Sequence, residues 1–189
     1  MQLEAEFHAA REQAIQKDRT ALLTTASKPL FDEPSFRTVV EVPALGAKDD
    51  DWHATFGRLS AGHKIVLHIV VQLCAYLDPH SLVLIDEPEL HLHPPLVAAL
   101  LRSINAALER YDSFGVVATH SPVVLQEVPA RNVRVLRRSF DELAVEVPDV
   151  ETFAENLGLL TRQVFSLDSS TTDFQSVLIH PAPATTLPS

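Results

Sequence analysis

An apolar run that ends in two adjacent carboxylates constrains the fold of this chain more than any other feature. Residues 82–85 read Leu-Val-Leu-Ile and are followed by Asp86, Glu87 and Pro88. A short apolar run bounded by proline is typical of a buried strand. Carboxylates at the end of such a strand would lie at the rim of a sheet, where open α/β folds bind ligands. The segment predicts that one acid holds a magnesium ion and its neighbour orients a water for phosphoryl transfer from a nucleotide.

The composition is that of one ordinary globular domain. The chain has 189 residues, of which 46% are hydrophobic, enough to bury a core. The formal net charge is −10 and no basic stripe is visible, so any contact with nucleic acid is expected to be indirect. Cys74 is the only cysteine, no leader pattern opens the chain, and no apolar run could span a bilayer. We expect a cytoplasmic protein without membrane contact.

Residues 1–55 are predicted to be a lead-in of helix and strand. Residues 3–23 lack glycine and proline and favour one surface helix, which the prolines of residues 27–34 would end. Residues 38–42 favour a strand. The loop over residues 43–51 would then carry an acidic run that faces solvent.

Residues 56–140 alternate between strand and helix patterns. Helices are expected over residues 63–77, 95–110 and 123–127, and buried strands over 82–85, 115–119 and 133–136. This order predicts an α/β fold with a mostly parallel sheet covered by helices.

Residues 141–180 are predicted to add an edge strand over 143–147 and a helix over 151–167, interrupted at Gly158. The proline-rich residues 181–189 are expected to be disordered. The fold therefore has helical extensions at both ends of a parallel α/β core.

Four short motifs that could carry chemistry occur in order along the core. They are Ser60-Ala61-Gly62, Asp86-Glu87, Leu90-His91-Leu92-His93 and Thr119-His120-Ser121. Each alone is weak, since an acid pair can cap a helix and a histidine after a strand can be a satisfied polar residue. Together, over residues 56–136, they resemble the carboxyl-terminal half of an ABC-type ATPase domain. The variety they resemble is the AAA-like ATPases grouped with the overcoming-lysogenization-defect, recombination-repair and chromosome-maintenance ATPases.

The resemblance implies ATP and Mg²⁺ as ligands and a role for each motif. Ser60-Ala61-Gly62 matches the signature motif, which opens a helix whose amino end points at the γ-phosphate held by the other subunit of a head-to-tail dimer. Asp86 matches the Walker B acid that holds magnesium, and Glu87 the residue that polarises the attacking water. Adjacent strand residues point opposite ways, so only a turn at the strand end would let both acids reach the site.

Histidines occupy three further positions of the family pattern. His120 matches the switch histidine that contacts the γ-phosphate from its own subunit. His93 lies in the loop that crosses to the partner, where the family commonly has an acid. His63 replaces the glutamine that many relatives have after the signature glycine.

The chain lacks the glycine-rich loop that cradles phosphates in this family. Of its five glycines, only Gly57 and Gly62 imitate the spacing. The imitation fails because His63 intrudes before Lys64, Ile65 replaces a magnesium-binding hydroxyl, and no strand precedes it. The glutamine loop is not identifiable either. We expect the second half of a longer ATPase, truncated, split or cut from a larger protein, that needs an upstream or partner P-loop.

Two alternatives stay open. The chain could be a non-enzymatic fragment that contributes its signature face to a partner ATPase or regulates it. His91, His93, His120 and Glu89 could instead form a metal site of a hydrolase, although their spacing matches no zinc pattern. The relatives act in DNA repair, chromosome maintenance and phage defence, so the resemblance implies a nuclease or another repair or defence protein as partner.

Overall fold

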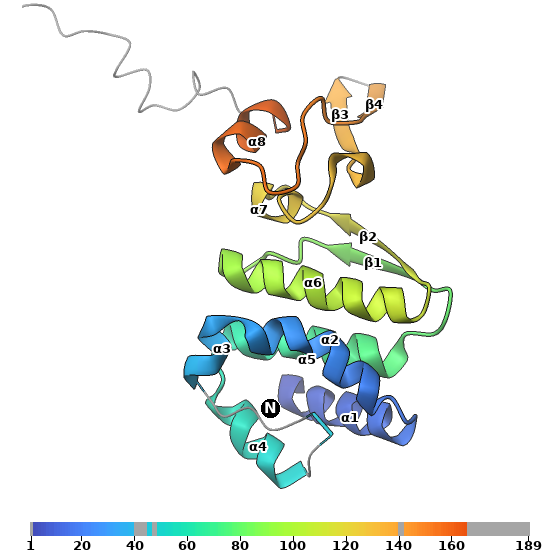
Figure 1. The fold of residues 1–189 in the computed structure, drawn as a ribbon, viewed down its shortest axis with the longest axis vertical. Coiled ribbons are helices and arrows are strands. Elements are labelled where there is room, and N and C mark those ends of the chain that lie inside the picture. The colour runs from blue at the N-terminus through green and yellow to red at the C-terminus, as the bar shows by residue number, and fades with distance from the viewer. Residues whose placement is uncertain (1, 40–44, 47–48, 140–141, 166–189) are drawn as a thin grey trace, which may run out of the picture. The chain divides into compact units, whose positions relative to one another are not determined.

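The computed structural model describes residues 2–39, 45–46, 49–139 and 142–165. It divides into two compact units, Met1–Glu127 and Val128–Ser189. In the first unit, the elements in chain order are α1 (Gln2–Gln16), α2 (Thr20–Asp32), α3 (Pro34–Val39), α4 (Asp49–Arg58), α5 (Ala61–Tyr76), β1 (Leu82–Asp86), α6 (Pro94–Arg110), β2 (Phe114–Ala118) and α7 (Pro122–Leu125). The predicted α/β fold with a parallel sheet flanked by helices is confirmed (Figure 1).

The parallel sheet consists of β1 and β2. Their register runs from Leu82 opposite Phe114 to Asp86 opposite Ala118. The backbone N–H of Glu87 donates to the carbonyl of Ala118 over 2.8 Å and so continues the ladder one residue beyond β1. Because parallel strands end at the same edge of a sheet, the residues that follow β1 and β2 lie next to each other.

Helix α6 covers one face of this strand pair and leaves the other open. Val83 and Ile85 are partly buried against the core. Gly115 is opposite Val83 in the register, and a Cβ atom there would lie 2.9 Å from Cδ1 of Leu108 in α6. The alternate residues of the two strands are exposed, and they are Leu82 (63%), Leu84 (73%), Phe114 (70%) and Val116 (54%). The prediction that these strands are buried is therefore wrong for the alternate residues, because the described residues cover only one face of the pair.

The hydrophobic core of the first unit lies among the helices. In Figure 1, α6 lies between the strand pair and the helices α2 and α5. The predicted helices over residues 63–77 and 95–110 are confirmed as α5 and α6. Their fully or almost fully buried residues include Val66, Leu67, Val70, Val71, Leu100, Ile104 and Ala107. Their spacing is that of one apolar helical face.

The amino-terminal residues form two helices where one was predicted over residues 3–23. The break lies at Asp18, whose φ of 57° is in the left-handed region. Arg19 explains the break, because its guanidinium donates to the carbonyls of Cys74, Ala75 and Leu77 at 3.1, 3.2 and 2.7 Å.

Helix α2 continues through Pro29 and ends at Asp32, so the predicted break does lie within residues 27–34, at Glu33 before Pro34 and not at Pro29. An interior proline removes a hydrogen bond and costs about 3 kcal/mol in a helix. The helix compensates by packing, since Leu23, Ala26 and Leu30 are fully buried. Burial of the apolar face overrides local propensity here.

The rest of the predicted lead-in differs as well. Thr38 and Val39, which were predicted to begin a strand, lie in helix α3, and residues 40–42 lie outside the described residues. The predicted acidic loop is instead the start of α4 at Asp49. Acidic residues are favourable in the first turn of a helix, where the dipole is positive.

The second unit contains η1 (Ala130–Asn132), β3 (Val135–Ser139), β4 (Glu142–Glu146) and α8 (Leu157–Gln163). The predicted strands over residues 133–136 and 143–147 exist, but they form an antiparallel hairpin instead of extending the parallel sheet. The predicted helix over residues 151–167 is reduced to α8. Before it, the Glu151 carboxylate accepts hydrogen bonds from the backbone N–H groups of Ala130, Thr152 and Phe153, which lower its pKa.

The remaining predictions concern boundaries. The expected tail over residues 181–189 lies outside the described residues. The domain limits at residues 55, 140 and 180 stay predictions. In the described part of the chain, no helix has the length and apolar character needed to cross a membrane.

We predict that Arg19→Ala lowers the free energy of unfolding by about 2–3 kcal/mol, because three carbonyls at the end of α5 lose a charged donor that is only 12% exposed. Urea denaturation measures this loss. The control is Arg102→Ala, which removes an arginine that is 62% exposed and paired with Glu127, and should cost about 0.5 kcal/mol or less. Equal effects of the two variants would contradict the assignment.

Candidate functional site

The chain turns sharply where β1 ends. Glu87 has a φ of 43°, which is uncommon for a residue with a side chain. Its N–H is held by the carbonyl of Ala118, and its own carbonyl accepts from the N–H of Leu90 at 3.1 Å. This turn redirects the Glu87 side chain relative to Asp86, as the acid pair requires.

Glu87 and His120 are brought together at the shared edge of the two strands. Nδ1 of His120 lies 2.9 Å from Oε1 of Glu87. The Glu87 side chain is 38% exposed and the His120 side chain is 68% exposed, so a ligand can reach both. A carboxylate beside an imidazole can orient a water and donate a hydrogen bond to a charged oxygen. The structure thus joins two of the predicted site residues, while their roles stay predictions.

A second contact at this edge was missed from the sequence. The Thr119 hydroxyl donates to Oε1 of Glu89 and accepts from the N–H of Ser121 at 2.9 Å. It ties the end of β2 to the turn that follows β1. Oε2 of Glu89 is buried and has no hydrogen-bond partner among the described residues. The contact holds the backbone on both sides of His120, and the only sequence signal for it is a threonine at a strand end.

Asp86 is exposed and lies on the rim of a groove of about 520 Å³. The groove runs between α5, β1 and α6, and its wall is mostly apolar, including Ile65, Ile69, Leu73, Leu84, Leu100 and Ile104. An exposed carboxylate fits Mg²⁺, which takes one or two protein carboxylates together with the phosphates of its substrate. Its exposure would let Asp86 hold such an ion, and that role stays a prediction.

The predicted signature residues form the start of α5. Ser60 caps the helix, and its Oγ accepts from the backbone N–H of His63 at 3.3 Å. Ser60 and Ala61 are exposed. A Cβ on Gly62 would lie 3.4 Å from Leu96 and 3.6 Å from Leu92. The first turn of the helix is therefore open to solvent on the side of Ser60 and packed by leucines beside Gly62.

His63 is buried, with 6% of its surface exposed. Its Nδ1 lies 2.8 Å from Oγ of Ser60 and its Nε2 lies 2.8 Å from Oγ of Ser35. Burial lowers the pKa of this imidazole, and the charge of Glu33 opposes that effect. The sequence did not decide what His63 contacts. In the structure its side chain is buried and contacts Ser60 and Ser35.

The loop from Pro88 to His93 lies between two groups of predicted site residues. The strand-end group is Glu87 and His120, and the signature group is Ser60 to His63. Leu92 of this loop packs beside Gly62. His93 is exposed and precedes α6 without capping it by its side chain. Hydrogen bonds join Glu87 to His120 and Ser60 to His63. Over the residues that the structure describes, no hydrogen bond links these two groups.

The histidine metal site considered above is not formed. Glu89, His91, His93 and His120 are all described, and their ligand atoms do not converge. Within the described ranges, the group that does bring three ligand atoms within 4.8 Å of one another is Glu4, His8 and His53. The rings of His8 and His53 stack at 3.7 Å with 24° between their planes. In-plane lone pairs of stacked rings do not point at a common ion, so this geometry is not a preformed metal site.

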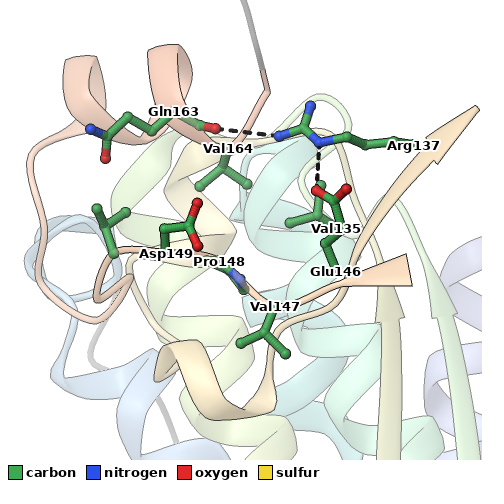
Figure 2. Close-up of a pocket in the computed structure, with 9 residues that line it drawn as sticks. Val135, Arg137, Glu146, Val147, Pro148, Asp149, Gln163 and Val164 are labelled. Carbon is green, nitrogen blue, oxygen red and sulfur yellow. Dashed lines mark hydrogen bonds and ion pairs between the residues drawn. The ribbon is translucent and has the colours of Figure 1, made fainter. Parts of the chain in front are cut away.

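The second unit has a hollow of its own, of about 220 Å³. Figure 2 shows Arg137 between Glu146 and Gln163 at its rim. Nε of Arg137 donates to Glu146 at 2.9 Å, and Nη2 donates to the carbonyl of Gln163 at 3.5 Å. Arg137 thus joins β3 to Glu146 of β4 and to the end of α8, and these contacts stabilise the second unit.

Comparison with known proteins agrees with the motif order. Residues 20–126 match the model of a family described as "AAA domain, putative AbiEii toxin, Type IV TA system". The chain belongs to this family of AAA domains. The matched residues all lie in the first unit, which holds the strand ends and the start of α5. Membership supports nucleotide binding and a general ATPase function.

The chain is also similar to a phage protein. Over 121 residues it is 46% identical to Protein ea59 of Escherichia phage lambda. These residues cover 64% of this chain and 23% of the lambda protein, so the chain spans only a minor part of that relative.

We predict that the domain loses stability as the pH falls from about 7.5 to 5.5. Burial, the main cause, lowers the pKa of both His63 and His68 below the ordinary value of 6.5, while Glu33 and Glu6 act in the opposite direction. The unfolded chain therefore takes up protons near pH 6.5 that the folded chain still refuses. The free energy of unfolding, measured by urea denaturation across this range, should be highest above pH 7.

The matched control is His63→Gln, which removes one of the two groups and should reduce the slope of stability against pH. A flat profile in the unsubstituted protein, or an unchanged slope in the variant, would contradict the burial argument.

Proposed function

We propose that this chain is the hydrolytic half of an AAA-type ATPase whose phosphate-binding loop comes from upstream sequence or from a partner. The observation that carries the proposal is the contact between Glu87 and His120 at the carboxyl edge of a parallel strand pair. Open α/β sheets bind ligands at this edge. The family match gives the general ATPase function, and the contact supplies residues for the chemistry.

Each residue would act on a bound nucleotide in a defined way. Glu87 would orient and polarise the attacking water, and His120 would donate a hydrogen bond to the γ-phosphate. Asp86 would hold Mg²⁺. In the second group, the exposed N–H groups at the start of α5 and the hydroxyl of Ser60 would face the γ-phosphate of a neighbouring subunit in a head-to-tail dimer.

The uncovered face of the sheet supports the proposal that a second polypeptide half of the ATPase packs there. Parallel sheets are covered on both faces in almost all known proteins. Four apolar side chains are instead exposed, and they form one patch because the first and third residues of the two strands pair in register, Leu82 with Phe114 and Leu84 with Val116. The occupant we propose is the half that carries the phosphate-binding loop. The lambda protein, of which this chain covers 23%, has room for such a half.

The process that the ATPase would drive follows from its relatives only. The matched family is described in terms of a type IV toxin–antitoxin system. We propose a role in phage defence or DNA repair beside a nuclease or another protein of that pathway. The net charge of −10 favours indirect contact with nucleic acid.

We predict that Glu87→Gln lowers the kcat of the assembled ATPase about 10²–10⁴-fold, because the amide cannot polarise the water. Steady-state ATP hydrolysis measures this, with the chain joined to its loop-bearing half. Glu109→Gln is the control, since Glu109 is exposed on α6 and its side chain bonds only to Asn105 in the described part. Full activity of the Glu87 variant, or no turnover by an assembly with an intact loop, would contradict the proposal.

We predict that Leu84→Glu prevents assembly with the loop-bearing half while the isolated chain stays folded. Leu84 is 73% exposed, so a carboxylate there is solvated in the free chain and buried in the complex. Analytical ultracentrifugation of the mixture shows the loss, and circular dichroism checks the fold. The control is Leu157→Glu in the second unit, where the leucine is 41% exposed. Equal binding by both variants would place the interface elsewhere.

A non-enzymatic role is the second candidate, and the absence of a phosphate-binding loop from the sequence favours it for the isolated chain. The chain would then present only its α5 start to a partner's ATP. Calorimetric titration of the isolated chain with ATP and Mg²⁺ separates the readings. Micromolar binding by the chain alone would rule out this candidate and would mean that residues 57–64 bind phosphate.

A further inference from the structure

A chain of hydrogen bonds runs from the surface hydroxyl of Ser60 into the protein. Oγ of Ser60 contacts Nδ1 of His63 at 2.8 Å, and Nε2 of His63 contacts Oγ of Ser35 at 2.8 Å. The Ser35 hydroxyl in turn donates to Oε2 of Glu33, which also accepts the Ser35 backbone N–H at 2.8 Å. The four residues come from the start of α5, from α3 and from the turn between α2 and α3.

The imidazole in this chain is fixed. His63 is 6% exposed, and the ring of Phe36 lies edge-on to it with 4.4 Å between centroids. Ser60 by contrast is exposed at the amino end of α5. Both nitrogens of His63 are therefore bonded to serine hydroxyls, and at the other end of the hydrogen-bond chain Ser35 and Glu33 are partly buried.

The donors and acceptors allow only one order of donation along these hydrogen bonds, from Ser60 at one end through His63 and Ser35 to Glu33 at the other. An ionised carboxylate only accepts, so the single hydrogen of the Ser35 hydroxyl goes to Glu33. Oγ of Ser35 must then accept from Nε2–H of His63. A neutral imidazole protonated on Nε2 has a bare Nδ1, which accepts from the hydroxyl of Ser60.

The hydroxyl of Ser60 is consequently turned inward. Its oxygen accepts the backbone N–H of His63, and its one hydrogen is used by Nδ1. In this state Ser60 has no hydrogen to offer to an anion at the start of α5. A proton taken from solvent by Nδ1 would reverse the bond, because Nδ1–H would then donate to Oγ and release the Ser60 hydrogen.

We propose that Glu33, Ser35 and His63 are positioning residues that set the direction of the Ser60 hydroxyl and couple it to the protonation of His63. This rests on the proposed function, in which Ser60 faces a nucleotide phosphate. His63 gains a proton from solvent and no heavy-atom bond changes. Phosphate binding at Ser60 then favours the protonated imidazole, and protonation favours binding by the same factor.

The charges around His63 fit this coupling. Glu33 is the charged group whose field acts on the imidazole and favours its protonated form. The neighbouring Asp32 forms ion pairs with Lys28 and Arg37. Ser35 and Phe36 from α3 are uncharged, and Lys64 points instead to the carbonyl of Gly57 and over the ring of Phe56.

The direct test is ¹⁵N NMR of the histidine rings in the full chain at pH 7.5. The signals of His63 are identified by their loss in His63→Gln. We expect Nε2–H with a bare Nδ1. In Glu33→Gln and in Ser35→Ala the preference should weaken to a mixture of tautomers, because Nε2–H loses its directed acceptor. Glu109→Gln, on the surface of α6, should leave the signals unchanged.

A His63 ring protonated on Nδ1, or an unchanged tautomer in both the Glu33 and Ser35 variants, would overturn the proposal. This arm needs no nucleotide, so it stands or falls independently of ATP hydrolysis.

The functional arm uses the assembled ATPase. We expect kcat/KM for ATP to rise as the pH falls through the pKa of His63, by about fivefold or more. His63→Gln should abolish this rise, because an amide N–H can donate to Ser60 at any pH and leaves the hydroxyl free. Unfolding temperature controls for lost structure. The same pH profile in the variant would show that the four residues only cap their helices.

Discussion

A pair of parallel strands cannot cover its own faces, and the first unit is organised around that constraint. Helix α6 covers one face, and Gly115 lets it approach, since any Cβ there would meet Leu108 at 2.9 Å. The same helix packs on α2 and α5, so the strand pair is joined to the helical core through one element (Figure 1). The other face stays apolar and exposed, which is a state that folded parallel sheets rarely keep.

The parallel direction of the strands also determines which residues meet at the candidate site. Because β1 and β2 end at the same edge, the residues after them must meet, and Glu87 and His120 do so at 2.9 Å. Two constraints sharpen this meeting. The backbone of Glu87 is left-handed where β1 ends, and the bond from Thr119 to Glu89 fixes the chain before His120. Stored backbone strain of this kind is common where a site must be held in place.

The sequence was sufficient for the elements whose signal is local. Helices α5 and α6 have long apolar periodicity, and β1 and β2 have breakers at their ends, so all four could be predicted. What escaped prediction depends on distant contacts. Pro29 is tolerated because its helix is buried, and the exposure of Leu84 depends on what is absent from one face of the sheet. The partner of His63 could not be predicted either, because Ser35 lies 28 residues before it.

The division of the candidate site into two groups argues against a self-sufficient enzyme. A phosphate held between Glu87 and His120 would need a cradle, and the sequence has no glycine-rich loop to supply it. At the start of α5, Oγ of Ser60 lies 2.8 Å from Nδ1 of His63. Hydrogen bonds satisfy each group separately within the described residues, so neither depends on the other. In the head-to-tail dimer proposed above, a nucleotide held at the strand ends of one subunit would meet the start of α5 of the other, so each bound nucleotide would couple the two groups across the subunits.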